Sequence, residues 1–67
     1  MPKKIRELKS MLKKAGFTSR PGKGSHSVWY HPRATRMVVL AGKDGDDAKR
    51  YQEKDVKERI SEVEGNP

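Results

Sequence analysis

The chain has 67 residues, of which 31% are hydrophobic and 37% are charged, so it is predicted to form one small domain with a thin core. It has no cysteine, which excludes a disulfide framework and a thiolate metal site. Its formal net charge of +7 comes from the first half, because residues 1–36 carry ten Lys or Arg and one Glu, whereas residues 37–67 carry six basic and eight acidic residues.

The N-terminal segment is predicted to be a helix that begins near Pro2, a residue that suits a first helical turn. Its apolar residues recur three and four positions apart, forming one stripe: Ile5, Leu8, Met11, Leu12 and Ala15. Gly16 suits the position that follows a helix end. A short strand that starts at Phe17 is expected next.

Two further strands are predicted in the middle of the chain. Residues 20–24 have the composition of a turn, because Pro and Gly supply its special dihedral angles. Residues 25–31 are rich in Val, Trp and Tyr and are predicted to be a strand, which Pro32 ends. Residues 36–41 contain the most apolar run of the chain, which predicts a buried strand.

A second helix is predicted after a polar loop at residues 42–47. Three apolar residues have helical spacing: Val56, Ile60 and Val63. Asp55 and Glu58 form a possible capping box, and the helix is predicted to cover residues 52–64. A helix that starts nearer Asp47 is the alternative prediction.

The order helix, strand, strand, strand, helix predicts an α+β fold. The simplest packing of this α-β-β-β-α chain is a three-stranded antiparallel sheet with both helices on one face. The other face would be open to solvent or a ligand. The domain is predicted to span residues 1–64, with residues 65–67 as a frayed tail.

The basic first half indicates a nucleic acid or an acidic protein as partner, although a merely solubilising surface has the same composition. The start of the chain lacks the apolar core of a signal peptide, and no segment approaches the roughly 20 apolar residues of a membrane span. We therefore expect a cytoplasmic protein without a membrane segment.

Residues 21–32 hold both histidines and the only tryptophan of the chain, and three kinds of chemistry compete there. Ser25 and His26 are neighbours on the predicted strand, so their side chains point to opposite faces, which disfavours a serine nucleophile activated by histidine. Zinc needs three or four ligands, and only His26 and His31 are candidates beside scattered carboxylates. We therefore predict no metal site and no cofactor.

The third chemistry is a histidine that faces a phosphate. Glycines on each side of Lys23 allow the backbone to approach a phosphate closely, and Arg20 and Lys23 would neutralise its charge. Histidine can move a proton near neutral pH, so His26 could take the proton of an RNA 2′-hydroxyl. The simpler alternative is a strand-start histidine hydrogen-bonded to the neighbouring turn.

The two aromatic residues of the central strand are predicted to have different roles. Trp29 is expected in the core, because a thin core needs its largest side chain. Strand alternation would then put His26, Val28 and Tyr30 together on the open face. Tyr30 could stack on a base there, although a half-exposed sheet tyrosine is the commoner explanation. The candidate RNA- and phosphate-binding residues are Arg20, Lys23, Gly24, Ser25 and Tyr30.

Four short features together resemble the HicA family: Gly16-Phe17 after a basic first helix, Gly24-Ser25-His26, His31-Pro32 and an apolar third strand. HicA proteins are small toxins of bacterial toxin–antitoxin pairs, with a fold like a double-stranded RNA-binding domain. The resemblance implies an mRNA interferase in which His26 is catalytic, and a HicB-type antitoxin partner that covers the site.

The sequence thus favours an endoribonuclease that binds RNA through its basic half and cleaves it with His26 without a metal ion. Two alternatives stay open. One is a non-catalytic RNA-binding module on the same scaffold. The other is a small basic protein that binds only an acidic partner.

Overall fold

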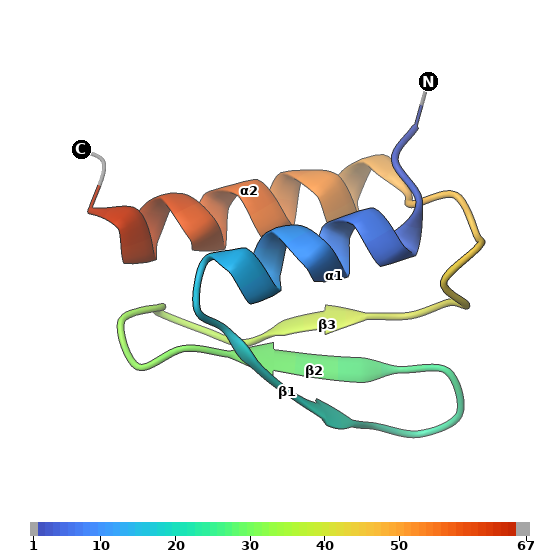
Figure 1. Ribbon diagram of the computed structural model, residues 1–67, viewed down its shortest axis with the longest axis horizontal. Coiled ribbons are helices and arrows are strands. Elements are labelled where there is room, and N and C mark those ends of the chain that lie inside the picture. The colour runs from blue at the N-terminus through green and yellow to red at the C-terminus, as the bar shows by residue number, and fades with distance from the viewer. Residues whose placement is uncertain (1, 66–67) are drawn as a thin grey trace.

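The computed structural model describes residues 2–65 and forms a two-layer α+β domain. Its elements are α1 (Ile5–Lys14), β1 (Thr18–Pro21), β2 (Ser27–Tyr30), β3 (Val38–Leu40) and α2 (Arg50–Glu64). The strands form one antiparallel sheet in the order β1-β2-β3, and both helices lie side by side over one face of it (Figure 1). The predicted α-β-β-β-α architecture is therefore confirmed.

The first helix begins three residues later than predicted, and Pro2 precedes it rather than lying in its first turn. The residues before α1 are extended instead, because they pair with the segment that leads into α2. Lys4 forms a single antiparallel β-bridge with Asp47, and the Ala48 N–H donates to the Lys3 carbonyl oxygen at 2.7 Å. This long-range pairing outweighs the local preference of proline for a helix start.

The turn between β1 and β2 also differs from the prediction, because β1 continues through Pro21, which lies opposite Ser27 on β2. Proline is tolerated there since β1 is an edge strand of the sheet. The turn therefore starts at Gly22, and it includes Ser25 and His26, although the sequence predicts both in the following strand. His26 thus belongs to a turn rather than to a strand.

The second helix begins at Arg50, two residues before the predicted start, and its predicted capping box is wrong. Asp55 lies inside the helix. The cap is formed by Gln52, whose side-chain oxygen accepts a hydrogen bond from the Lys49 N–H at 2.8 Å. The helix ends at Glu64 as predicted. Of the predicted tail, Gly65 follows the helix end, and residues 66–67 lie outside the described residues.

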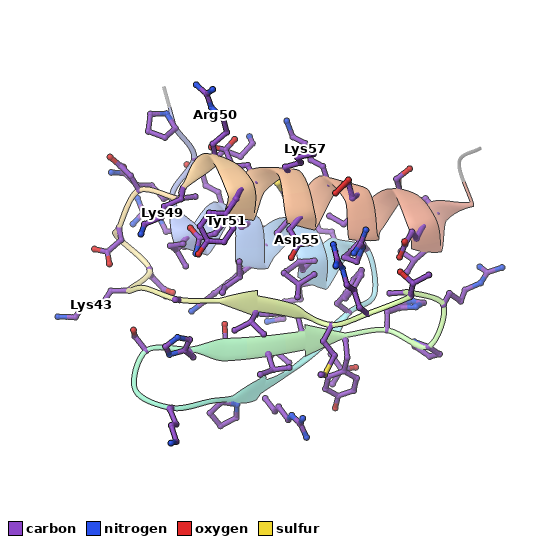
Figure 2. All side chains as sticks on the ribbon, turned by 180° about the vertical axis from the view of Figure 1, so that it is seen from behind. Lys43, Lys49, Arg50, Tyr51, Asp55 and Lys57 are labelled. Carbon is purple, nitrogen blue, oxygen red and sulfur yellow. The ribbon has the colours of Figure 1, made fainter. Side chains whose placement is uncertain are left out.

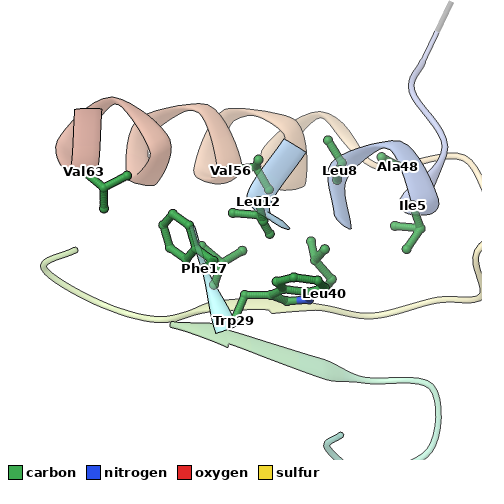
Figure 3. Close-up of a cluster of buried hydrophobic side chains, with 10 residues drawn as sticks. Ile5, Leu8, Leu12, Phe17, Trp29, Leu40, Ala48, Val56 and Val63 are labelled. Atoms are coloured by element: carbon green, nitrogen blue, oxygen red, sulfur yellow. The ribbon is translucent and has the colours of Figure 1, made fainter. Parts of the chain in front are cut away.

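The core lies between the two helices and the sheet (Figure 3). It consists of ten buried hydrophobic residues: Ile5, Leu8, Leu12, Phe17, Trp29, Val38, Leu40, Ala48, Val56 and Val63. Trp29 is only 6% exposed, and its Nε1–H donates to the Ser27 hydroxyl oxygen at 2.9 Å. The prediction that Trp29 is a core residue is therefore confirmed.

A carboxylate fastens the β2–β3 connection to the C-terminal part of α2. Glu62 accepts two hydrogen bonds from Thr35, from its backbone N–H at 2.9 Å and from its hydroxyl at 2.8 Å. These two bonds hold the pKa of the Glu62 carboxyl below its usual value, and the nearby charges of Arg59 and Arg36 act in the same direction. The connection therefore has a fixed position beneath the helix.

Candidate functional site

The β1–β2 turn fixes the orientation of the His26 ring. The ring nitrogen Nδ1 lies 2.8 Å from the backbone carbonyl oxygen of Lys23. A carbonyl oxygen can only accept, so Nδ1 must carry the proton of this hydrogen bond. In the neutral imidazole the other nitrogen, Nε2, is then an acceptor. The turn thus holds the ring in the tautomer in which Nε2 can accept a proton, as a general base must.

Two glycines shape this turn. A Cβ atom at Gly22 would lie 3.1 Å from the Cβ of His26, so a side chain there would crowd the histidine. Gly24 has a φ of +56°, which places it in the left-handed region that glycine adopts without strain. The Gly22 N–H donates to the His26 carbonyl oxygen at 2.9 Å and closes the turn. Gly22 therefore positions His26, a role that the sequence analysis did not assign to it.

His26 lines an open groove of about 580 Å³ that runs between β3 and α2. We call it the His26 groove. The strand side contributes Met37 and Val39, and the helix side contributes Tyr51, Lys54 and Glu58. Figure 2 views this side of the molecule and labels Tyr51 and Asp55, which lie on the part of α2 above β3.

The groove is both apolar and charged. Residues 2–65 expose four large hydrophobic side chains, and three of them, Met37, Val39 and Tyr51, line it. Asp55 also lines it, with its Oδ1 atom 3.7 Å from Arg36 Nη2 and 3.6 Å from Arg59 Nη1. The charge of this carboxylate is therefore offset locally by two guanidinium groups.

The positive charge around the turn is not neutralised by the acidic residues of the second half. Instead, two loop aspartates pair with lysines of the N-terminal segment and α1. Lys4 Nζ lies 2.6 Å from an oxygen of Asp47, and Lys9 Nζ lies 2.7 Å from an oxygen of Asp44. Within the described part of the chain, Arg20 and Lys23 form no ion pair, so their charges remain available to an anionic ligand.

Four of the five predicted binding residues lie in the turn that contains His26 or in the strand next to it. Lys23, Gly24 and Ser25 share its turn, and all three are exposed. Arg20 is exposed in the adjoining part of β1, opposite Val28. Tyr30 is the exception, because it occupies the end of β2 that is farther from His26 and does not line the groove.

The second histidine packs against a core residue and does not line the His26 groove. The His31 ring packs against Phe17, with a distance of 5.3 Å between the ring centroids. Its Nδ1 accepts a hydrogen bond from the Arg33 N–H at 3.0 Å. His26 and His31 flank opposite ends of β2, and among residues 2–65 no group of three or more His, Cys, Asp or Glu side chains is placed to hold a metal ion.

The family model of the HicA toxin of bacterial toxin–antitoxin systems matches residues 5–61, which run from the start of α1 through most of α2. The chain belongs to the HicA toxin family. HicA toxins are known as RNases, and membership of a toxin–antitoxin family implies an antitoxin partner. Neither the curated proteins nor the solved structures contain a significant match to the chain.

The HicA match includes both sides of the His26 groove, since α2 and β3 lie within residues 5–61. Of the residues that line the groove, the sequence assigned only His26 to the site, and Tyr51 and Lys54 are among those that it missed. No helix within residues 2–65 is both long and apolar enough to cross a membrane.

Proposed function

We propose that the chain is a metal-independent endoribonuclease that cleaves mRNA with His26 as the general base. One observation carries this proposal. The hydrogen bond from Nδ1–H to the Lys23 carbonyl leaves Nε2 of an exposed ring free to accept a proton. A histidine whose tautomer is fixed by a backbone carbonyl is prepared for acid–base work. Family membership supports the same conclusion.

The proposed reaction is an internal transfer within the RNA backbone. Nε2 of His26 takes the proton of a 2′-hydroxyl, and the 2′-oxygen attacks the adjacent phosphorus. The bond between phosphorus and the 5′-oxygen of the next nucleotide breaks, that oxygen gains a proton from solvent, and His26 releases to solvent the proton that it took. The products are a 2′,3′-cyclic phosphate and a 5′-hydroxyl end, so no external reactant is consumed.

The residues around His26 are proposed to hold the phosphate while its charge increases. Arg20 of β1 and Lys23 of the turn are exposed and without an ion-pair partner in residues 2–65, so both can contact an anion that lies near the turn. The N–H groups of Gly24 and Ser25 take part in none of the backbone hydrogen bonds of the described turn. Backbone N–H groups and cations at such a position stabilise a developing phosphorane.

We also propose that the partner is a HicB-type antitoxin that covers His26. The family relation supports an antitoxin, and the exposed position of His26 supports a site that a second protein can cover. Covering the ring would exclude RNA without any change in the fold of the chain.

Cleavage of a matched pair of oligonucleotides tests the proposed reaction. The purified protein is expected to cleave an RNA and to leave the all-deoxy strand of the same sequence intact, because the latter lacks the 2′-hydroxyl. EDTA is expected to have no effect. Mass spectrometry of the products should identify the cyclic phosphate. Cleavage of the DNA strand, or cleavage that EDTA abolishes, would contradict the mechanism.

The salt dependence of RNA binding tests the assigned cations. On single strands the logarithm of the affinity should fall with the logarithm of salt concentration by about 0.7 per neutralised phosphate. Arg20→Ala and Lys23→Ala are each expected to reduce the magnitude of this slope by about 0.7, the contribution of one phosphate contact. Lys9→Ala is the matched control, because Lys9 is already paired with Asp44. Fluorescence anisotropy between ~50 and ~200 mM salt measures the slope, and a salt-independent affinity would exclude nucleic acid as the ligand.

A further inference from the structure

The protein exposes two tyrosines, and only one of them shares a groove with His26. Tyr51 is 64% exposed and lines the His26 groove, whereas Tyr30 is 40% exposed and does not. Tyr51 lies in the first turn of α2, and Figure 2 shows it on the same side of the helix as Asp55, above β3. An aromatic ring and the candidate catalytic histidine, which come from different parts of the chain, therefore line the same groove.

Packing does not account for the position of this ring. Tyr51 is the most exposed of the large hydrophobic side chains in residues 2–65 and is absent from the core cluster. Its hydroxyl takes part in no hydrogen bond of the described residues. An exposed ring at the mouth of a groove offers a flat apolar face to a ligand, and every nucleobase has a complementary π-face.

The charges beside Tyr51 suit a nucleotide chain. Lys54 lies one helical turn further along α2, lines the same groove and forms no ion pair within residues 2–65. Asp55 would repel a phosphate, but Arg36 and Arg59 offset its charge. Glu58 is two helical turns away from Tyr51. The end of the groove at Tyr51 thus combines an aromatic face with a free cation.

We propose that Tyr51 is a stacking platform for a base of single-stranded RNA next to the phosphate at His26, and that Lys54 contacts the backbone there. This inference rests on the proposed function. A 2′-oxygen can attack in line with the leaving 5′-oxygen only when the nucleotide departs from regular helical stacking. A base that stacks on Tyr51 no longer stacks on the neighbouring bases. The stacking energy with Tyr51 replaces what is lost, so binding of the RNA favours the reactive geometry.

Binding of a 2′-O-methyl oligonucleotide separates this inference from catalysis, because such a strand cannot be cleaved by attack of a 2′-hydroxyl. Tyr51→Ala and Tyr51→Leu are each expected to weaken binding by about 5- to 150-fold, the range that loss of one base–aromatic stack produces. Tyr51→Phe should bind as the wild type does. Thr18→Ala, a change at an exposed position of β1 that does not line the groove, is the control and should also bind normally. Circular dichroism verifies that each variant is folded.

A second measurement locates the stacked base. One abasic position is moved along the oligonucleotide, and the affinities of the wild type and Tyr51→Ala are compared at each position. At the position whose base stacks on Tyr51, the abasic change should weaken binding to the wild type. It should cause no further loss of affinity for Tyr51→Ala, which already lacks the stack. Equal losses for both proteins at every position would overturn the assignment of Tyr51.

The outcomes distinguish a failure of this inference from a failure of the proposed function. Cleavage by the wild type with normal RNA binding by Tyr51→Ala overturns the inference alone. If RNA binding depends on Tyr51 but the wild type does not cleave RNA, the inference about Tyr51 is supported and the proposed nuclease activity is wrong. If Tyr51→Ala binds RNA normally but loses affinity for the antitoxin, the groove is a protein interface, and the inference is again wrong.

Discussion

Replacing His26 with alanine is expected to reduce the rate of RNA cleavage by about 100- to 10,000-fold, the usual loss when general acid–base assistance is removed. The stability of the fold should hardly change, because the ring is exposed and makes a single hydrogen bond, to the Lys23 carbonyl. Single-turnover cleavage of a labelled RNA measures the rate, and thermal denaturation measures the stability.

Two further variants make this result specific. His26→Gln retains a side-chain N–H that can donate to the Lys23 carbonyl but provides no basic nitrogen, so its loss of rate should match that of His26→Ala. His31→Ala should retain cleavage in its folded fraction, since His31 packs on Phe17 and lies outside the groove. A wild-type rate for His26→Ala would leave RNA binding without catalysis as the better account.

Replacing Trp29 with alanine should unfold most of the protein. Removing a buried aromatic side chain typically costs about 3–5 kcal/mol, and Trp29 is the largest residue of a ten-residue core. A domain of this size has little stability to lose. Circular dichroism during urea denaturation is the measurement.

The neighbouring residue supplies the control for Trp29. Tyr30 points to the opposite, open face of β2, so Tyr30→Ala is expected to change the free energy of unfolding by about 0.5 kcal/mol or less. If Trp29→Ala stayed folded and lost only RNA binding, Trp29 would be a ligand-contacting residue and the two sheet faces would have been assigned the wrong way round.

Most of the core was predictable because the first helix and the central strand have local signals, whereas nothing local marks Ala48 as a core residue. Ile5, Leu8 and Leu12 repeat at helical spacing, and alternation along β2 separates Trp29 from Tyr30. Element ends were less predictable because long-range contacts decide them. Pro2 is kept out of α1 by the pairing of residues 3–4 with residues 47–48, which no local pattern reveals.

The candidate site was predictable only on its turn side. Gly24-Ser25-His26 and the adjacent cations are contiguous in the sequence, so their composition alone indicates a phosphate-facing turn. Tyr51 was missed because it lies outside a helix predicted to start at residue 52, so the prediction assigned it to no helix face. With the true start at Arg50, helical geometry places Tyr51 away from the apolar stripe of α2, where it must be exposed.

The extended residues before α1 pair with the segment that leads into α2 and therefore affect the order in which the fold can form during synthesis. Lys3 and Lys4 leave the ribosome before their partners at residues 47–48. One wall of the His26 groove consists of α2, which leaves the ribosome after the histidine turn. A nascent chain therefore carries the histidine turn before it has the groove, and the complete site arises only after α2 has been synthesised.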